Sequence, residues 1–259
     1  MKKKILFVGA SFAQVPPIKY AKKMGYYVVA CDQNKKSPGF KYCDESYIIS
    51  TTNKKKIYEL SKKLKINGII TYVSDTASPA VSYVAKKLNL KGLPIKAVNT
   101  LVYKNLFRKF LKKNNFNYPE FKIFRSKEKI NNFIDKIGYP FFIKPIDSSG
   151  SKGVTKVVKK IFIKKAISEA LNYSKKKKFI IERIIERKGY QIAGDGFVMN
   201  KKLVFRCWGD EHFNEKLNGL ITIGPSLPSV HQEKKFKIAH QETQRIINLL
   251  GITNGALNF

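Results

Sequence analysis

The segment from residue 137 to 154 has the residue types of a phosphate-binding loop. An apolar run ends in Lys144 and Pro145, and the stretch from Ser148 to Gly153 that follows is made of small and polar residues. Such a loop exposes backbone N–H groups and hydroxyls to an anion, and its glycines let the backbone come close to it. The alternative is an ordinary polar hairpin, because glycine-rich loops give many false matches and no Gly-Lys-Ser/Thr leads into a helix here.

Charged residues on both sides of this segment favour a nucleotide over an isolated phosphate. Lys104 precedes Arg108 by one helical turn, which places both on one helix face. Glu182 ends an apolar run, and Ile185 follows shortly after it. An adenine pocket needs apolar walls, together with a backbone segment and a carboxylate that read the amino edge of the base. Glu182 and the backbone near Ile185 would meet that need.

Two polar residues further along the chain, Arg206 and His212, are candidates for a catalytic role. His212 would act on a phosphate or on the substrate, and the alternative is a polar residue of a strand. Arg206 would pair with an anion or simply with Glu211. We interpret His231 and His240 as residues of a loop and of a helix surface.

The elements that must position these residues fall into two parts. In residues 1 to about 95, apolar runs alternate with helical patterns, which is typical of βαβ units and a parallel sheet. Ser74 and Asp75 are placed to cap the last helix of this part. The first part is therefore predicted to be a Rossmann-like open sheet. Its expected strands are 4–8, 26–30, 47–50 and 68–73, and its expected helices include 16–24 and 54–64.

The second part, from residue 96 to 259, predicts an α+β arrangement. It opens with a basic amphipathic helix at Asn99–Asn114. Two strands are expected within residues 190–205, joined by a turn at 199–201, and a long helix over 233–250 is expected to end at Gly251. The other expected strands are 121–124, 140–145, 154–158, 179–183 and 255–259, and the other expected helices are 127–137 and 163–173.

Length and composition exclude several classes of protein. The chain has 259 residues, of which 43% are hydrophobic and 12% aromatic, so it is neither disordered nor fibrous. No apolar run approaches the roughly 18 residues of a membrane-spanning helix. The N-terminal apolar run is too short for a secretion signal, and three cysteines without metal-ligand spacing fit a reducing cytoplasm. We therefore expect a cytoplasmic protein without a membrane partner.

The strong basic charge is a weaker indication than it first suggests. The chain carries 51 Lys and Arg against 18 Asp and Glu, a formal net charge of +33. Only six of these residues are Arg, the residue that bidentate phosphate and base recognition favours. We interpret the lysines mainly as a solvated surface, and nucleic-acid binding stays the less favoured alternative.

Taken in chain order, these segments resemble the ATP-grasp superfamily in its carbamoyl-phosphate-synthase-like and biotin-carboxylase-like forms. The resemblance implies a Rossmann-like pre-ATP-grasp domain over residues 1–95 and a partial ATP-grasp α+β fold over 96–259, with a lid subdomain at about 120–185. The stretches that carry it are GASFAQVPPIKYAKKMGYYVVACD (9–32), KNLFRKFL (104–111), YPFFIKPIDSSGSKGV (139–154), FIIERII (179–185) and LLGITNGALNF (249–259).

Position by position, the resemblance implies a set of ATP contacts. Lys104 and Lys144 would contact the phosphates, and Lys144 would also take part in catalysis. Glu182 and the backbone near Ile185 would bind adenine. Gln191 stands where the family usually has a ribose-binding Glu. The lid loop over the phosphates would consist of Ser148, Ser149, Gly150, Ser151, Lys152 and Gly153.

The activity that the resemblance implies is that of an ADP-forming, ATP-dependent carboxylate–amine ligase acting through an acyl-phosphate. Its partners would be ATP and a small carboxylate, and the sequence leaves the acceptor and any self-association open. The family holds Mg²⁺ with an acidic residue and a Glu-x-Asn pair that would follow Phe259, so we assign no metal ligand and expect a truncated chain. The alternative to an enzyme is a non-catalytic nucleotide-binding module or fragment.

Overall fold

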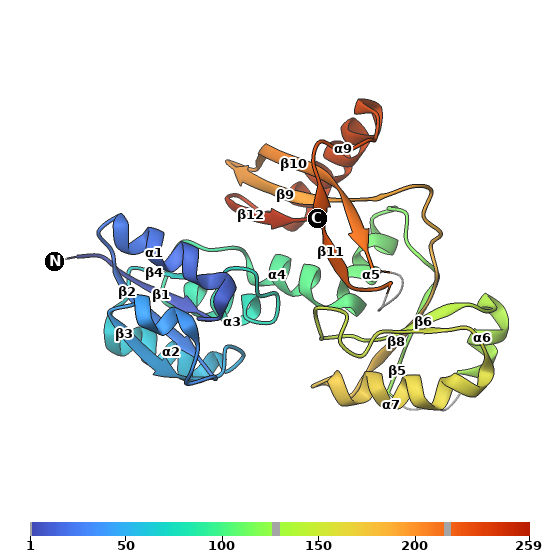
Figure 1. Cartoon of the computed structure of the whole chain (residues 1–259), viewed down its shortest axis with the longest axis horizontal. Coiled ribbons are helices and arrows are strands. Elements are labelled where there is room, and N and C mark those ends of the chain that lie inside the picture. The colour runs from blue at the N-terminus through green and yellow to red at the C-terminus, as the bar shows by residue number, and fades with distance from the viewer. Residues whose placement is uncertain (1, 126–129, 215–218) are drawn as a thin grey trace. The chain divides into compact units, whose positions relative to one another are not determined.

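The computed structural model describes residues 2–125, 130–214 and 219–259. It divides the chain into two compact units, Met1–Val102 and Tyr103–Phe259 (Figure 1). Within the described ranges, no helix combines the length and the apolar character needed to cross a membrane.

The single helix expected at Asn99–Asn114 is wrong, because the chain forms two helices there. Helix α4 (Ile95–Val102) packs against α3 (Ser78–Lys87), so it stays with the first unit. Helix α5 (Lys104–Lys113) opens the second unit. Between them Tyr103 has an extended backbone, with φ −89° and ψ 112°, which ends one helix and starts the next.

A four-stranded parallel sheet with helices around it forms the first unit, as the alternating pattern predicted. Its elements are β1 (Lys4–Val8), α1 (Val15–Lys23), β2 (Tyr27–Asp32), β3 (Glu45–Ile48), α2 (Lys54–Leu64) and β4 (Gly68–Ile70), with short 3-10 helices at Phe12–Gln14 and Pro38–Tyr42. The strand order is β3-β2-β1-β4. Leu6 packs in a buried cluster with Ile57 of α2, and Phe7 in another with Ile18 of α1. Alternate residues of β1 therefore bury both faces of the sheet.

The predicted cap of α3 is also wrong. Residues Ser74 and Asp75 lie before the helix, which begins at Ser78 and is preceded by Ala77 without a capping side chain. The N–H of Ala77 donates to the carbonyl of Ser74 at 3.1 Å, so these residues form a turn of their own. The hydroxyl of Ser78 then donates to the same carbonyl at 3.2 Å.

The second unit begins with an antiparallel sheet that packs on two helices. Its elements are β5 (Phe121–Phe124), α6 (Asn131–Ile137), β6 (Phe141–Pro145), β7 (Thr155–Val157), a 3-10 helix (Lys160–Phe162), α7 (Ile163–Tyr173) and β8 (Phe179–Arg183). The strand order is β5-β8-β6-β7. Phe141, Ile143, Phe179 and Ile181 are fully buried on one face, in a cluster with residues of α6 and α7. The expected helix at 127–137 falls partly on residues 126–129, which lie outside the described ranges.

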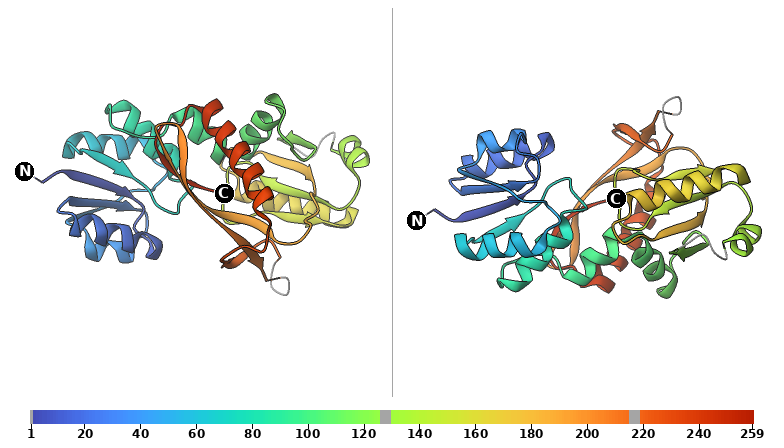
Figure 2. Two further views of the ribbon diagram at one scale, coloured as in Figure 1. Left: turned by 90° about the horizontal axis from the view of Figure 1, so that it is seen from above. Right: turned by 90° about the horizontal axis from the view of Figure 1, so that it is seen from below.

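A second antiparallel sheet completes this unit. It contains β9 (Gln191–Met199), β10 (Lys202–Phe213), β11 (Thr222–Ser226) and β12 (Gly255–Asn258), with helix α9 (Glu233–Leu250) alongside (Figure 2). The strand order is β11-β10-β9-β12. Strand β10 runs well past its expected end at residue 205, and β11 was not predicted.

The ends of two of these elements follow from their residues. Helix α9 ends where predicted, because Gly251 takes the left-handed conformation with φ 65°. The predicted turn between β9 and β10 is also confirmed. Asn200 and Lys201 both have positive φ, at 50° and 68°, as a two-residue hairpin turn requires.

Candidate functional site

Glu182 receives two cations on one buried carboxylate. Its side chain is 3% exposed, and Oε1 accepts a hydrogen bond from Nζ of Lys144. Arg108 donates from Nε to Oε2 at 3.0 Å and from Nη2 to Oε1 at 3.4 Å. The structure thus brings together two predicted site residues and adds Arg108, which the sequence indicated by its spacing from Lys104 and by its place in the stretch 104–111.

The strand register explains how this cluster forms. Strands β6 and β8 pair with Phe142 opposite Glu182, so Lys144 is the diagonal neighbour of Glu182 on the same face. That face lies opposite the one that Phe141 and Ile143 bury in the core. Arg108 reaches the same carboxylate from α5. The cluster therefore depends on sheet pairing and on a helix that is distant in sequence.

The two cations set the charge state of Glu182. Burial opposes ionisation of this carboxyl, but the charges of Lys144 and Arg108 and their hydrogen bonds outweigh it and hold the pKa of Glu182 below its ordinary value. The ionised carboxylate is nearly inaccessible, whereas the side chains of Lys144 and Arg108 are 18% and 20% exposed. The cluster therefore presents positive charge to solvent at a fixed position.

The loop between β6 and β7 has the backbone of a compact anion cradle. Gly150, Ser151 and Gly153 take left-handed conformations, with φ of 61°, 55° and 73°. Successive N–H groups in such turns can face a common anion. Lys104 donates from Nζ to the carbonyl of Ser148, the first residue of the loop. The structure therefore brings Lys104 to the loop.

Contacts at both ends fix this loop. Asp147 accepts from the hydroxyl of Ser174 at 2.7 Å and from the N–H of Lys176 at 2.9 Å. At the tip, Ser151 donates from Oγ to the carbonyl of Leu220 at 2.7 Å, just before β11. The loop is therefore tied to both sheets of the second unit.

Other predicted site residues lie apart from this cluster. Ile185 follows β8, and its side chain is 67% exposed. Gln191 is exposed at the start of β9, where it pairs in register with Glu211. Arg206 donates to Glu233 of α9 at 3.4 Å, which corrects the expected pairing with Glu211. The reason is that α9 packs across β10, an arrangement that sequence neighbours cannot indicate.

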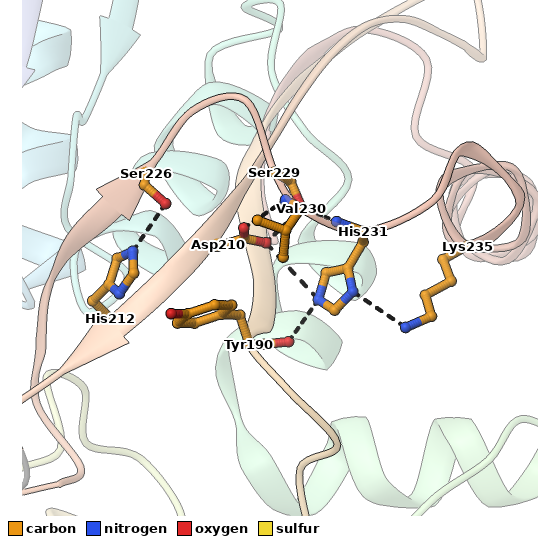
Figure 3. A network of polar contacts seen from close by, with 8 residues as sticks. All are labelled: Tyr190, Asp210, His212, Ser226, Ser229, Val230, His231 and Lys235. Atoms are coloured by element: carbon orange, nitrogen blue, oxygen red, sulfur yellow. Dashed lines mark hydrogen bonds and ion pairs between the residues drawn. The ribbon is translucent and has the colours of Figure 1, made fainter.

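His212 lies in a strand and His231 in a loop, as their interpretation allowed. His212 lies in β10 with Nε2 2.9 Å from Oγ of Ser226, and its ring meets Tyr190 edge-on at 5.0 Å. The ring of His231 is 8% exposed, so describing it only as a loop residue was incomplete. His231 and Asp210 belong to one polar network that sequence reasoning missed, because their contacts join segments that only the folded sheet brings together (Figure 3).

The described residues lack a cluster of metal-ligating side chains. Among residues 2–125, 130–214 and 219–259, no group of three or more His, Cys, Asp or Glu is placed to hold one. These residues do not form a Mg²⁺ site by themselves. The loop, Lys104 and the Lys144–Glu182–Arg108 cluster, in contrast, offer donors and positive charge that suit a nucleotide.

Part of the chain resembles proteins that are already known. A family model described as "D-ala D-ala ligase C-terminus" matches residues 110–203. The chain is 25% identical over 182 residues to the formate-dependent phosphoribosylglycinamide formyltransferase of Prochlorococcus marinus (strain MIT 9515). That match covers 68% of this chain and 46% of the relative. The chain thus spans about half the length of the curated relatives it matches.

Solved structures match the whole chain in fold. Phosphoribosylglycinamide synthetase from Anaerococcus prevotii superposes with a TM-score of 0.74 at 23% identity, over 100% of this chain and 64% of that one. The biotin carboxylase domain of Hydrogenobacter thermophilus 2-oxoglutarate carboxylase gives 0.78 at 18% identity, over 100% and 61%. These matches confirm the resemblance to the ATP-grasp superfamily that was found in the sequence.

Proposed function

We propose that this chain is the ATP-binding part of an ADP-forming ligase that joins a carboxylate to an amine or a similar nucleophile. The observation that carries the proposal is the cluster in which Glu182 holds Lys144 and Arg108 beside the loop of residues 148–153. Its place in the ATP-grasp superfamily and its similarity to a phosphoribosylglycinamide formyltransferase support the same activity. We expect it to act in the cytoplasm on ATP and a small carboxylate.

Lys144 is the central phosphate ligand in this proposal. An ammonium group has three donors and no acceptor, so Lys144 can keep one hydrogen bond to Glu182 and direct the others to phosphate oxygens. Glu182 thereby fixes the position of the charge before ATP arrives. Lys104 would act at the Ser148 end of the loop, and the N–H groups of residues 148–153 would surround the phosphates.

The adenosine contacts follow the family assignment. Glu182 and the backbone near Ile185 would read adenine, and Gln191 would hydrogen-bond the ribose hydroxyls without a charge. Because both carboxylate oxygens of Glu182 already accept hydrogen bonds, adenine would share Oε1 or Oε2 through a remaining lone pair.

The reaction has two steps that differ in the bond broken. A carboxylate oxygen attacks the γ-phosphorus of ATP, the bond to the bridging oxygen breaks, and ADP leaves. The amine then attacks the acyl carbon, and phosphate leaves with the electrons of the C–O bond. Lys144 would stabilise charge in the first step, and Arg206 and His212 are the proposed groups near the acceptor. Mg²⁺ bound with ATP would neutralise phosphate charge, as the MgADP of the 2-oxoglutarate carboxylase structure suggests.

Calorimetric titration with ATP tests this assignment directly. Lys144→Ala should weaken binding at least about tenfold, which corresponds to roughly 1.4 kcal/mol. Lys165→Ala is the matched control, because Lys165 is an exposed lysine of α7, which packs on the opposite face of the sheet. Unchanged ATP affinity in Lys144→Ala would overturn the assignment. A phosphate-release assay with candidate carboxylates then tests whether bound ATP is turned over.

A further inference from the structure

A buried carboxylate organises the connection between β11 and α9. Asp210 of β10 is fully buried, and Oδ1 accepts from the hydroxyl of Ser229 at 2.5 Å (Figure 3). Oδ2 accepts from the N–H of Val230 at 2.7 Å. Burial opposes ionisation of Asp210, but these hydrogen bonds from Ser229 and Val230 lower its pKa. The carboxylate therefore stays ionised and holds the connection against the sheet.

The same connection carries His231, whose ring has a defined proton arrangement. Nδ1 lies 3.2 Å from Nζ of Lys235, and Nε2 lies 2.8 Å from the carbonyl oxygen of Tyr190. An ammonium group only donates, so Nδ1 must accept from Lys235. Nε2 therefore carries the ring proton and donates it to Tyr190. Asp210 lies 3.8 Å from Nε2 on the same side.

Tyr190 contacts both His231 and His212. Its ring meets that of His212 edge-on, with centroids 5.0 Å apart and planes at 65° (Figure 3). On the other side, Nε2 of His212 lies 2.9 Å from Oγ of Ser226. His212 is thus held between Tyr190, just before β9, and Ser226, at the end of β11. The carbonyl of Leu220, which accepts from Ser151 of the phosphate loop, lies just before β11.

We propose that Asp210 and His231 are positioning residues that hold Tyr190, and through it His212, next to strand β11, before which Leu220 contacts the loop of residues 148–153. Neither of them would touch the reactants. Asp210 fixes the backbone that carries His231, and His231 fixes the carbonyl of Tyr190. The proposal rests on the proposed function in one respect only, the role of His212 near the acceptor.

Nuclear magnetic resonance of the imidazole rings tests the arrangement in the protein without nucleotide. The chain has three histidines, so substitution of each one in turn assigns the signals. In uniformly ¹⁵N-labelled protein, long-range ¹H–¹⁵N correlations at pH 8 should show His231 with its proton on Nε2. Lys235→Met should turn this into a mixture of both tautomers, because Nδ1 loses its donor. A His231 ring protonated on Nδ1 would overturn the proposal.

The link to His212 is tested with Asp210→Asn. This variant should alter the His231 pattern and move the carbon-bound proton signals of His212 in the direction that Tyr190→Leu moves them. His240→Gln should leave both unchanged. If Asp210→Asn does not fold, as judged by circular dichroism, Ser229→Ala replaces it, because it removes one donor and leaves the carboxylate. Unchanged His212 signals in the folded variant would overturn the link.

Kinetics separate positioning from general stability. In a phosphate-release assay, Asp210→Asn should lower kcat about tenfold or more while KM for ATP stays within twofold, because the ATP cluster lies on the other sheet. A rise in KM for ATP with kcat unchanged would contradict positioning at the acceptor. If the chain bound no ATP, the proposed function would fail while the imidazole signals would still decide the role of Asp210 and His231.

Discussion

Lys144 donates to Glu182 from the diagonal position on the neighbouring strand, so the buried carboxylate and its cation are fixed by the pairing of β6 with β8. Arg108 completes the arrangement from α5, and Glu182 accepts from both. The side chain of Glu182 is only 3% exposed, so removing its charge leaves two partly buried cations without an anion and costs free energy of folding. The three side chains proposed to serve nucleotide binding are therefore also expected to stabilise the fold.

Glu182→Gln should destabilise the second unit by about 2–4 kcal/mol, because it leaves two partly buried cations without their anion. Urea unfolding followed by circular dichroism measures this as a lower midpoint with an unchanged m value. Glu186→Gln, in the exposed segment after β8, is the control and should change the free energy of unfolding by less than about 0.5 kcal/mol. Equal effects of the two substitutions would contradict the role of the cluster.

The depressed pKa of Glu182 predicts a pH dependence of stability. The folded protein holds this carboxyl ionised at a pH where a free glutamate, with a pKa of about 4.3, takes up a proton. Its contribution is complete above the unfolded pKa and is lost as the pH falls through the lower folded pKa. The free energy of unfolding of the native chain should fall more steeply below pH 4.3 than that of Glu182→Gln. Parallel acid limbs for the two proteins would contradict the prediction.

Two glycines of the loop of residues 148–153 allow the cost of backbone strain to be separated from the cost of a side-chain clash. Gly150 and Gly153 both have positive φ, but an added Cβ at Gly150 meets nothing within 4 Å, whereas at Gly153 it meets Tyr173 at 3.0 Å. Gly150→Ala should cost about 1 kcal/mol from backbone strain, and Gly153→Ala about 1–2 kcal/mol more from the contact. Thermal unfolding measures both. A larger loss for Gly150→Ala would show that the loop is not packed on α7 in this way.

Local sequence patterns predicted the elements that end in residues with a strong conformational preference. Gly251 ends α9, and the apolar periodicity of residues 163–173 gives α7 with the bounds expected. The break at Tyr103 was not predicted, because the amphipathic pattern continues across it and only the packing of α4 on α3 separates the two helices.

The sequence predicted those parts of the candidate site that lie within single segments of the chain. The loop of residues 148–153 and the residues Lys104, Lys144 and Glu182 follow from local patterns, and the structure brings them into two linked groups. The pairing of Lys144 with Glu182 depends on strand register, which a single sequence does not specify. The Asp210–His231 contact likewise depends on how β11 leads into α9, and β11 was not predicted at all.

The cysteines provide a last test, of how tightly the first sheet is packed. Cys31 lies fully buried in β2, where burial and then the charge of Asp32 raise the pKa of its thiol to about 12. The thiolate is the reactive form, so Cys31 should resist a disulfide-exchange reagent at pH 8 in the folded chain. Cys207 of β10 is only partly buried and should react first.

Cys207→Ser provides the matched measurement for this test. In that variant, labelling of Cys31 should become fast only in urea concentrations that unfold the first unit, so its rate reports opening of the parallel sheet. Cys43, half-buried with a pKa raised by burial, should react at an intermediate rate. Rapid labelling of Cys31 without denaturant would mean that β2 is not held between the two buried clusters, because a thiol enclosed on both sides reacts only after the sheet opens.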